Sequence, residues 1–188
     1  VVSGSYNRTD GHRNNMEFEQ YGGYAKLGYE MTGNWNLRGD INITHFNASY
    51  PGPITAPLLD GDQRITRGVT SFAIENNYEQ TSGGLSFFYN WGKHWINDGY
   101  AVGGEPLDYR FNSRDNMMGV SLYQSMQFFK GNRITAGIDW FRYGGKAWNE
   151  YVSGEHIGTT SDLVNKHENG LAGYVDLRQN IGTWLTFN

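Results

Sequence analysis

The sequence contains no cysteine, and this absence excludes several kinds of chemistry at once. Without thiols the chain has no disulfide framework, no cysteine nucleophile and no thiolate metal ligand. Long hydrophobic runs are also missing, and only 38% of the residues are hydrophobic. Because a membrane-spanning helix needs about 20 consecutive apolar residues, the sequence is not that of a helical membrane protein.

Positive charge is not in excess either, since 15 Lys and Arg residues stand against 19 Asp and Glu residues. The formal net charge of -4 gives no basic surface for nucleic acid, which we exclude as a partner. The sequence also lacks a Gly-x-Ser-x-Gly elbow, a phosphate-binding loop and a zinc motif. We therefore expect a protein that is not an enzyme.

What the chain does have is alternation, which is clearest between Trp35 and Phe46. The odd positions are Trp35, Leu37, Gly39, Ile41 and Ile43, and the even positions are Asn36, Arg38, Asp40, Asn42 and Thr44. This period of two predicts a β-strand with one apolar and one polar face. In a soluble sandwich the apolar face would cover a core, whereas in a membrane barrel it would face lipid and the polar face would line the interior.

The alternation recurs along the whole chain. The predicted strands cover residues 1–7, 21–31, 35–46, 67–78, 84–95, 118–128, 134–140, 171–178 and 184–188. Long connections (8–20, 47–66, 96–113 and 146–167) alternate with tight turns such as Thr32-Gly33-Asn34. In an antiparallel meander this places all long loops at one end and all turns at the other, which Greek-key sandwiches rarely do.

The fold prediction is therefore all-β: an antiparallel up-and-down meander that is a segment of a large transmembrane β-barrel. Residues 1–188 would form a partial barrel of about eight full strands plus the start of a ninth, because the pattern stops in mid-strand at Asn188. Aromatic residues at both strand ends support a membrane location, since such rings favour the two faces of a bilayer. Those near the turns are Tyr29, Trp35, Tyr78, Phe128 and Trp184, and those near the long loops are Tyr21, Phe46, Trp91, Trp95 and Trp140.

Several stretches resemble a known family. The residues 6–13, the strand Gly23-Tyr24-Ala25-Lys26-Leu27-Gly28-Tyr29 and the run Asn34-Trp35-Asn36-Leu37 resemble early barrel strands of TonB-dependent outer-membrane receptors. The strand Gly173-Tyr174-Val175-Asp176, with the return Gly182-Thr183-Trp184-Leu185-Thr186, is similar to the same family. The resemblance covers essentially the whole chain in style.

That resemblance implies a 22-stranded barrel in the outer membrane of a Gram-negative bacterium, closed by a plug domain and energised by the TonB protein. The expected function is uptake of a small nutrient such as a siderophore, another metal chelate or cobalamin. Neither the plug nor the TonB-contacting box is in this sequence. Two alternatives stay open: a complete small outer-membrane barrel, acting as adhesin or enzyme, and a soluble β-sandwich that binds carbohydrate.

Two groups of residues are candidate sites. Calcium takes six to eight oxygen ligands from flexible loops, and the resemblance to the cobalamin branch implies calcium there. The possible calcium ligands are Asp60, Asp62, Asp98 and Asp108, although Asp-Gly is also ordinary turn chemistry. The ligand-binding candidates in or beside the long loops are His12, Arg13, Arg64, His94, Arg110, Trp148 and His156. Arginine binds anionic chelates bidentately, whereas solvated loop charges and loop ion pairs are the simpler interpretation.

Overall fold

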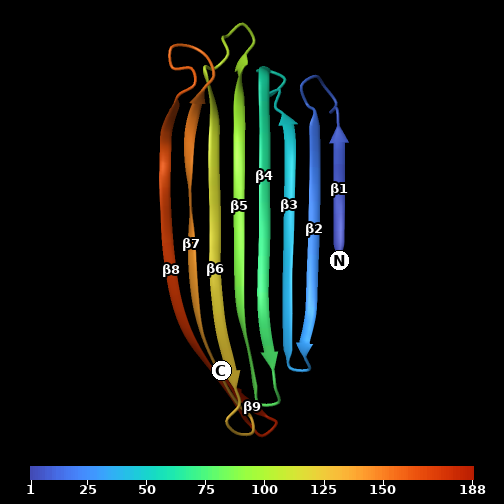
Figure 1. Cartoon of the computed structure of the whole chain (residues 1–188), viewed down its shortest axis with the longest axis vertical. Helices are drawn as coiled ribbons and strands as arrows, with labels where there is room; N and C mark the ends of the chain where they lie inside the picture. Colours follow the sequence, from blue (N-terminus) through green and yellow to red (C-terminus); the bar gives the residue numbers. More distant parts are fainter.

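The computed structural model describes all residues 1–188 and contains one antiparallel sheet of nine strands. The strands are β1 (Val2–Thr9), β2 (Phe18–Thr32), β3 (Trp35–Ser49), β4 (Leu58–Asn77), β5 (Thr81–Ala101), β6 (Tyr109–Met126), β7 (Asn132–Tyr151), β8 (Thr160–Ile181) and β9 (Leu185–Phe187). Each strand pairs with the next in sequence, so the predicted all-β meander is confirmed (Figure 1). No helix that could span a membrane is present.

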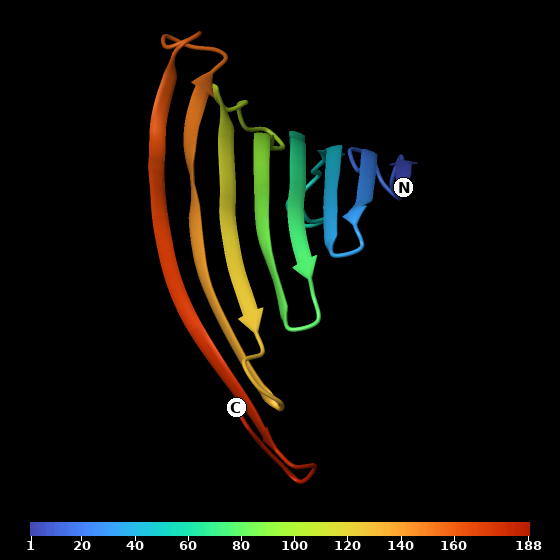
Figure 2. The same cartoon turned by 60° about the horizontal axis from the view of Figure 1, so that its bottom comes forward.

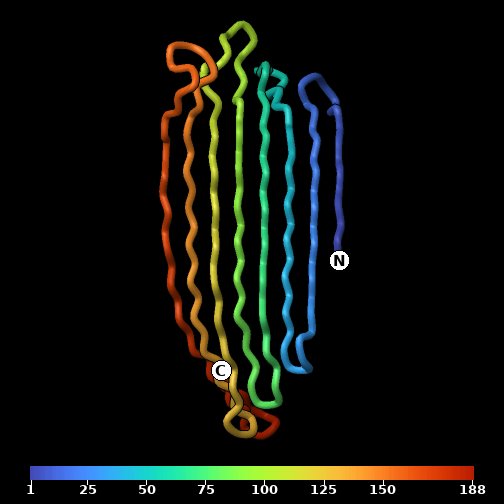
Figure 3. Tube along the Cα trace, viewed as in Figure 1, coloured from blue at the N-terminus to red at the C-terminus, as the bar shows by residue number.

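The connections sort to the two ends of the sheet as predicted. Loops 10–17, 50–57, 102–108 and 152–159 lie at the upper end in Figure 3, and the tight turns lie at the lower end. We call these the loop end and the turn end. No segment crosses either face of the sheet, so the strands form a single layer.

The predicted loop boundaries were wrong, because the strands continue far into the segments assigned to loops. β4 begins at Leu58 rather than near Arg67, and β7 continues to Tyr151 rather than ending near Trp140. In these extensions both faces carry polar residues, so the apolar alternation ends while the backbone ladder goes on. The three prolines Pro51, Pro53 and Pro57 confine the real loop between β3 and β4, because proline has no amide hydrogen to donate.

The sheet has no hydrophobic core. Only 14 of the 188 residues are buried, and the buried apolar residues are the two alanines Ala73 and Ala147. Figure 2 shows the sheet as one curved layer whose strands do not close on themselves. A two-sheet sandwich is therefore not the fold of this chain, and the nine strands do not make a closed small barrel.

The register collects the apolar residues on one face, which we call the apolar face. One row of cross-strand partners runs Leu27, Gly39, Phe72, Phe87, Val120, Trp140 and Leu171. A parallel row runs Tyr29, Leu37, Ile74, Leu85, Leu122, Ile138 and Gly173. Nine of the twelve side chains in these two rows are exposed, from 37% for Trp140 to 72% for Leu171, and Leu37, Ile74 and Val120 are half-buried.

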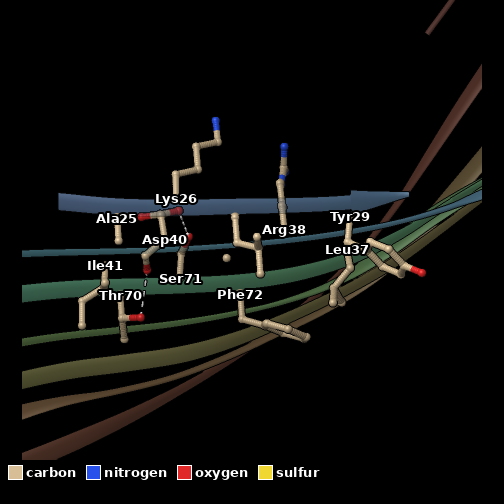
Figure 4. A pocket seen from close by; sticks show the side chains of 12 residues that line it. Ala25, Lys26, Tyr29, Leu37, Arg38, Asp40, Ile41, Thr70, Ser71 and Phe72 are labelled. Atoms are coloured by element: carbon tan, nitrogen blue, oxygen red, sulfur yellow. Dashed lines mark hydrogen bonds between the residues drawn. The ribbon is translucent and has the colours of Figure 1, made fainter. Parts of the chain in front are cut away.

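The opposite face, which we call the polar face, carries small and charged residues. Its row between the two apolar rows runs Gly28, Arg38, Ala73, Ser86, Ser121, Asp139 and Ala172. Figure 4 shows the division at β2–β4, where Lys26 and Arg38 point to one side of the ribbons and Leu37 and Phe72 to the other. Gly39 contributes no side chain to this region, where a hollow of about 440 Å³ is found.

The apolar rows form a band that shifts along the sheet. Toward the loop end the band reaches Ile43 on β3, but on β7 it stops at Trp140, four residue pairs (two rows of the apolar face) closer to the turn end. Toward the turn end it continues to Leu177 on β8. A band of constant height shifts in this way when the strands are tilted across it, as in barrels.

Aromatic rings cover glycines on neighbouring strands. A methyl group added to the glycine would lie within 2.4 Å of the ring in each of the pairs Trp91–Gly68, Phe88–Gly119, Phe141–Gly170 and Tyr174–Gly137. All four are direct cross-strand partners. The large ring packs over the space that the glycine leaves, which stabilises the register of a sheet that has no core.

Candidate functional site

The densest polar cluster lies on the polar face near the loop end and joins β4, β5 and β6. Arg67 Nη2 donates to Asp115 Oδ1 at 2.8 Å, and Arg67 Nη1 lies 3.2 Å from His94 Nε2. His94 Nδ1 lies 2.8 Å from Ser113 Oγ and 3.7 Å from Asp115 Oδ2. We call Arg67, His94, Ser113 and Asp115 the polar cluster, which offers both donors and acceptors to a solute on this face.

Gly92 makes the ion pair of the polar cluster possible. On the ladder it stands between its partners Arg67 and Asp115, so the two side chains must meet across the β5 backbone. A Cβ atom built on Gly92 would lie 2.4 Å from Asp115 Oδ2 and 2.9 Å from Arg67 Nη1. The absence of a side chain at this position therefore positions both charged groups.

One ion pair and two hydroxyl–carboxylate hydrogen bonds continue along the polar face away from the loops. Arg38 Nη2 lies 2.7 Å from Glu75 Oε1, and Ser71 donates a hydrogen bond to Asp40. Tyr143 donates to Glu168 at 2.6 Å. Because charge and hydroxyl groups run from the loop end toward the turns, this face can line a path for a polar solute.

The structure leaves three of the predicted ligand residues in loops. His12 and Arg13 lie in the loop 10–17, and His156 lies in the loop 152–159 with its ring 5.6 Å from that of Tyr151. The Arg13 guanidinium donates to the carbonyl of Gly52, which ties two neighbouring loops together. Arg13 thus has a loop-bridging contact in this structure.

The other four predicted residues lie on strands, and they do not share one surface. His94 belongs to the polar cluster, whereas Arg64 and Trp148 lie on the apolar face beyond the apolar band. The Arg64 guanidinium stacks over the ring of Trp95 at 4.4 Å. Arg110 donates to the carbonyls of Leu107 and Tyr109, and its side chain is 15% exposed. A single binding surface made of all seven residues is therefore not what the fold provides.

The four candidate calcium ligands do not converge. Asp60, Asp62 and Asp98 lie on strands β4 and β5 rather than in a loop, and only Asp108 lies in a loop. Asp62 pairs with Arg64 at 3.3 Å, and Asp60 Oδ2 accepts from Asn97 at 3.0 Å. No group of three or more histidine, aspartate or glutamate side chains is placed to hold a metal ion. Calcium binding stays a prediction.

The predicted turn at Asp60-Gly61 is a distortion inside β4. Asp60 has a φ of 57°, and Gly99 on the facing strand has a φ of 71°. The pairs on either side, Leu59 with Tyr100 and Gly61 with Asp98, keep the same register. Asp-Gly chemistry is thus used to bend a strand, because both residues tolerate positive φ.

A second cluster joins the first two strands at the loop end. Tyr6 and Tyr21 both donate to Glu19 Oε1, at 2.9 and 2.8 Å. These hydrogen bonds lower the pKa of Glu19, with the bond from Tyr21 contributing most, and the bond to Glu19 raises the pKa of Tyr6 and of Tyr21. The three residues lie on the loop side of the apolar band and hold β1 to β2.

One predicted aromatic residue lies on the wrong face for a belt. Phe46 is on the polar face, where its ring packs against Phe18 at 5.8 Å. The belt residues Trp91, Trp95 and Trp140 share the apolar face, and Trp35 Nε1 donates to Tyr78 at 2.8 Å near the turns.

Sequence reasoning missed Asp115 as a site residue. Its odd position in β6 puts it on the opposite face of the strand from Met118 and Val120.

Comparison of the sequence with protein-family models and with curated proteins gives no match.

Proposed function

We propose that this chain forms part of the wall of a transmembrane β-barrel in the outer membrane, in a receptor that takes up a small nutrient. The apolar face would contact lipid, the polar face would line the interior, and the loop end would face outward. The observation that carries this proposal is the exposed apolar band of a single-layer sheet without a core. Such a face is stable only against an apolar surrounding, because each fully exposed large apolar side chain forgoes about 1.5–3 kcal/mol of burial.

Two features support lipid over a protein layer as that surrounding. The apolar band shifts across the strands as a band of constant height does on tilted strands. Trp91 and Trp140 mark its loop-side edge, and Trp35 lies at its turn-side edge. Tryptophan favours the membrane–water interface.

A matched pair of single-cysteine variants tests the orientation, and the chain has no native cysteine to interfere. We expect Ser121→Cys on the polar face to react with a membrane-impermeant maleimide in outer-membrane vesicles. Val120→Cys on the apolar face should react only after the vesicles are dissolved in denaturant. Equal labelling of both variants in intact vesicles would contradict the proposed lipid contact.

The nutrient class is supported by the resemblance to TonB-dependent receptors and by the polar cluster that lies below the loops. The Arg67 guanidinium presents donors suited to an anionic or chelated solute. A plug domain and the TonB system would be the protein partners, and calcium the metal ion. Tryptophan fluorescence titrated with cyanocobalamin and with a ferric hydroxamate tests this class. A response to neither compound would contradict it without affecting the proposed barrel wall.

A further inference from the structure

Three cations stand side by side on the apolar face, just beyond the band. Lys93 on β5 is the cross-strand partner of Arg114 on β6, which is the partner of Lys146 on β7. All three residues are exposed. We call them the cationic row. None of them takes part in an ion pair, since the ion pairs of the chain involve other residues.

The cationic row itself contains no carboxylate, and Asp162, the partner of Trp148 on the same face, forms no ion pair with it. The residues that continue the row are uncharged, Thr66 on β4 and Asn165 on β8. Asp115 follows Arg114 in sequence, but it belongs to the opposite face and pairs with Arg67. Like charges directly opposite one another repel, so three neighbouring cations destabilise the sheet unless an anion lies against them.

Tryptophans hold the cationic row at a defined level. Lys146 Nζ lies 4.8 Å from the centre of the Trp148 ring, and the Arg114 guanidinium lies 5.9 Å from it. Trp91 lies on the side of the apolar band, next to Lys93 on β5. A hollow of about 390 Å³ is lined by Trp91, Lys93, Arg114 and Asn116, and also by Tyr89, Gly92 and Asp115. Tryptophans therefore flank the cationic row on both sides, with Trp91 toward the apolar band and Trp148 toward the loop end.

We propose that the cationic row binds the phosphate groups of lipid headgroups at the outer surface of the membrane. This inference rests on the proposed membrane orientation, which places the cations at headgroup level above the lipid-facing band. Charge complementarity selects the ligand, because three unpaired cations face outward with no carboxylate in their row. The hollow beside Arg114 gives a phosphate group space to approach the guanidinium and the Lys93 ammonium together.

Binding of phosphatidic acid to the purified protein in neutral detergent micelles tests this proposal, with native mass spectrometry as readout. A basic residue near an anionic membrane contributes about 1 kcal/mol, which is about fivefold in affinity. We expect the triple variant Lys93→Gln, Arg114→Gln, Lys146→Gln to bind about 100-fold more weakly. The single variant Arg114→Gln should bind about fivefold more weakly. Phosphatidylcholine and inorganic phosphate should bind the unaltered protein far more weakly than phosphatidic acid.

The matched control removes the same charges from the polar face, with Lys26→Gln, Arg133→Gln and Lys166→Gln, none of which forms an ion pair. It should keep full affinity. Equal loss in both triple variants would overturn the proposal, and tight binding of inorganic phosphate at the same residues would overturn the lipid source. If cysteine labelling distinguishes the two faces but lipid binding is unchanged by the substitutions, this proposal alone fails. If labelling does not distinguish the faces, the proposed membrane wall fails.

Discussion

At the scale of single residues, the polar cluster depends on a side chain that is absent. Arg67 and Asp115 are on strands separated by β5, and they meet only because Gly92 lies between them. The side chains of the ion pair are 52% and 43% exposed, so the pair itself contributes about 0.2–1 kcal/mol. Its geometry matters more than its energy, because it fixes the direction of the donors that face the interior.

Substituting Gly92 with alanine should therefore separate Arg67 from Asp115. The new methyl group would lie 2.4 Å from Asp115 Oδ2, so the carboxylate has to turn away. We expect a loss of about 1 kcal/mol in the free energy of unfolding, measured by denaturant titration in detergent micelles.

The control for this substitution is Gly28→Ala on the same face. No heavy atom lies within 4 Å of a Cβ built on Gly28, so this variant should be neutral or slightly stabilised. If the two variants lose the same stability, the cost comes from the backbone preference of glycine rather than from the ion pair.

At the scale of elements, the sequence predicted the strands well where one face is apolar and poorly where neither is. The alternation from Trp35 to Ile43 fixes which residues of β3 face which way, and the register agrees. The extension of β7 from Lys146 to Tyr151 has no such alternation, because both of its faces meet polar surroundings. The sequence therefore predicts a loop at Trp148, although this residue lies on the same face of β7 as Trp140. The predicted site has the same error, because a residue can be assigned to a face of the sheet only when it is recognised as part of a strand.

The hydrogen bonds of Tyr6 and Tyr21 to Glu19, which join β1 to β2, predict a pH dependence at the element scale. A lowered pKa at Glu19 means that its hydrogen bonds stabilise the pairing above the ordinary carboxyl pKa of about 4.3, and that this contribution is lost as the pH falls through the folded value. The raised pKa values of Tyr6 and Tyr21 mean that the same hydrogen bonds stabilise the pairing below a pH of about 10. This contribution is lost as the pH rises through the folded pKa values of the two tyrosines.

We expect Tyr6 and Tyr21 to ionise at higher pH than a tyrosine without a carboxylate partner, as followed by NMR of carbon-13-labelled tyrosine. Glu19→Gln removes the charged acceptor and should lower both titration midpoints toward the ordinary value. Midpoints that do not move in this variant would mean that Glu19 is not the cause of the shift. Phe18→Leu, which changes the neighbouring residue on the other face, is the matched control.

At the scale of the whole molecule, each strand pairs with the next strand in sequence, yet the sheet has no interior. The strands are joined by 111 backbone hydrogen bonds, whereas two alanines are the only buried apolar residues of the sheet. Backbone pairing and ring-over-glycine contacts set the shape of such a layer, but they leave its apolar face uncovered. Stability must then depend on what covers that face, which makes the free energy of unfolding a property of the protein together with its surroundings.

A charge placed in the centre of the apolar band tests this dependence directly. Ile41→Lys puts an ammonium group on the face that we assign to lipid, and near the bilayer centre this should cost about 2–4 kcal/mol. Asn42→Lys, one residue further along β3, puts the same group on the polar face and should cost little. The measurement is the fraction of each variant that folds into lipid vesicles over a denaturant series. The two variants should be alike in stability if a polar medium covers both faces, because an exposed lysine then costs little on either side. A selective loss for Ile41→Lys would instead require an apolar medium on that face alone, and the depth dependence can be followed by moving the lysine to Ile43 and then to His45 at the edge of the band.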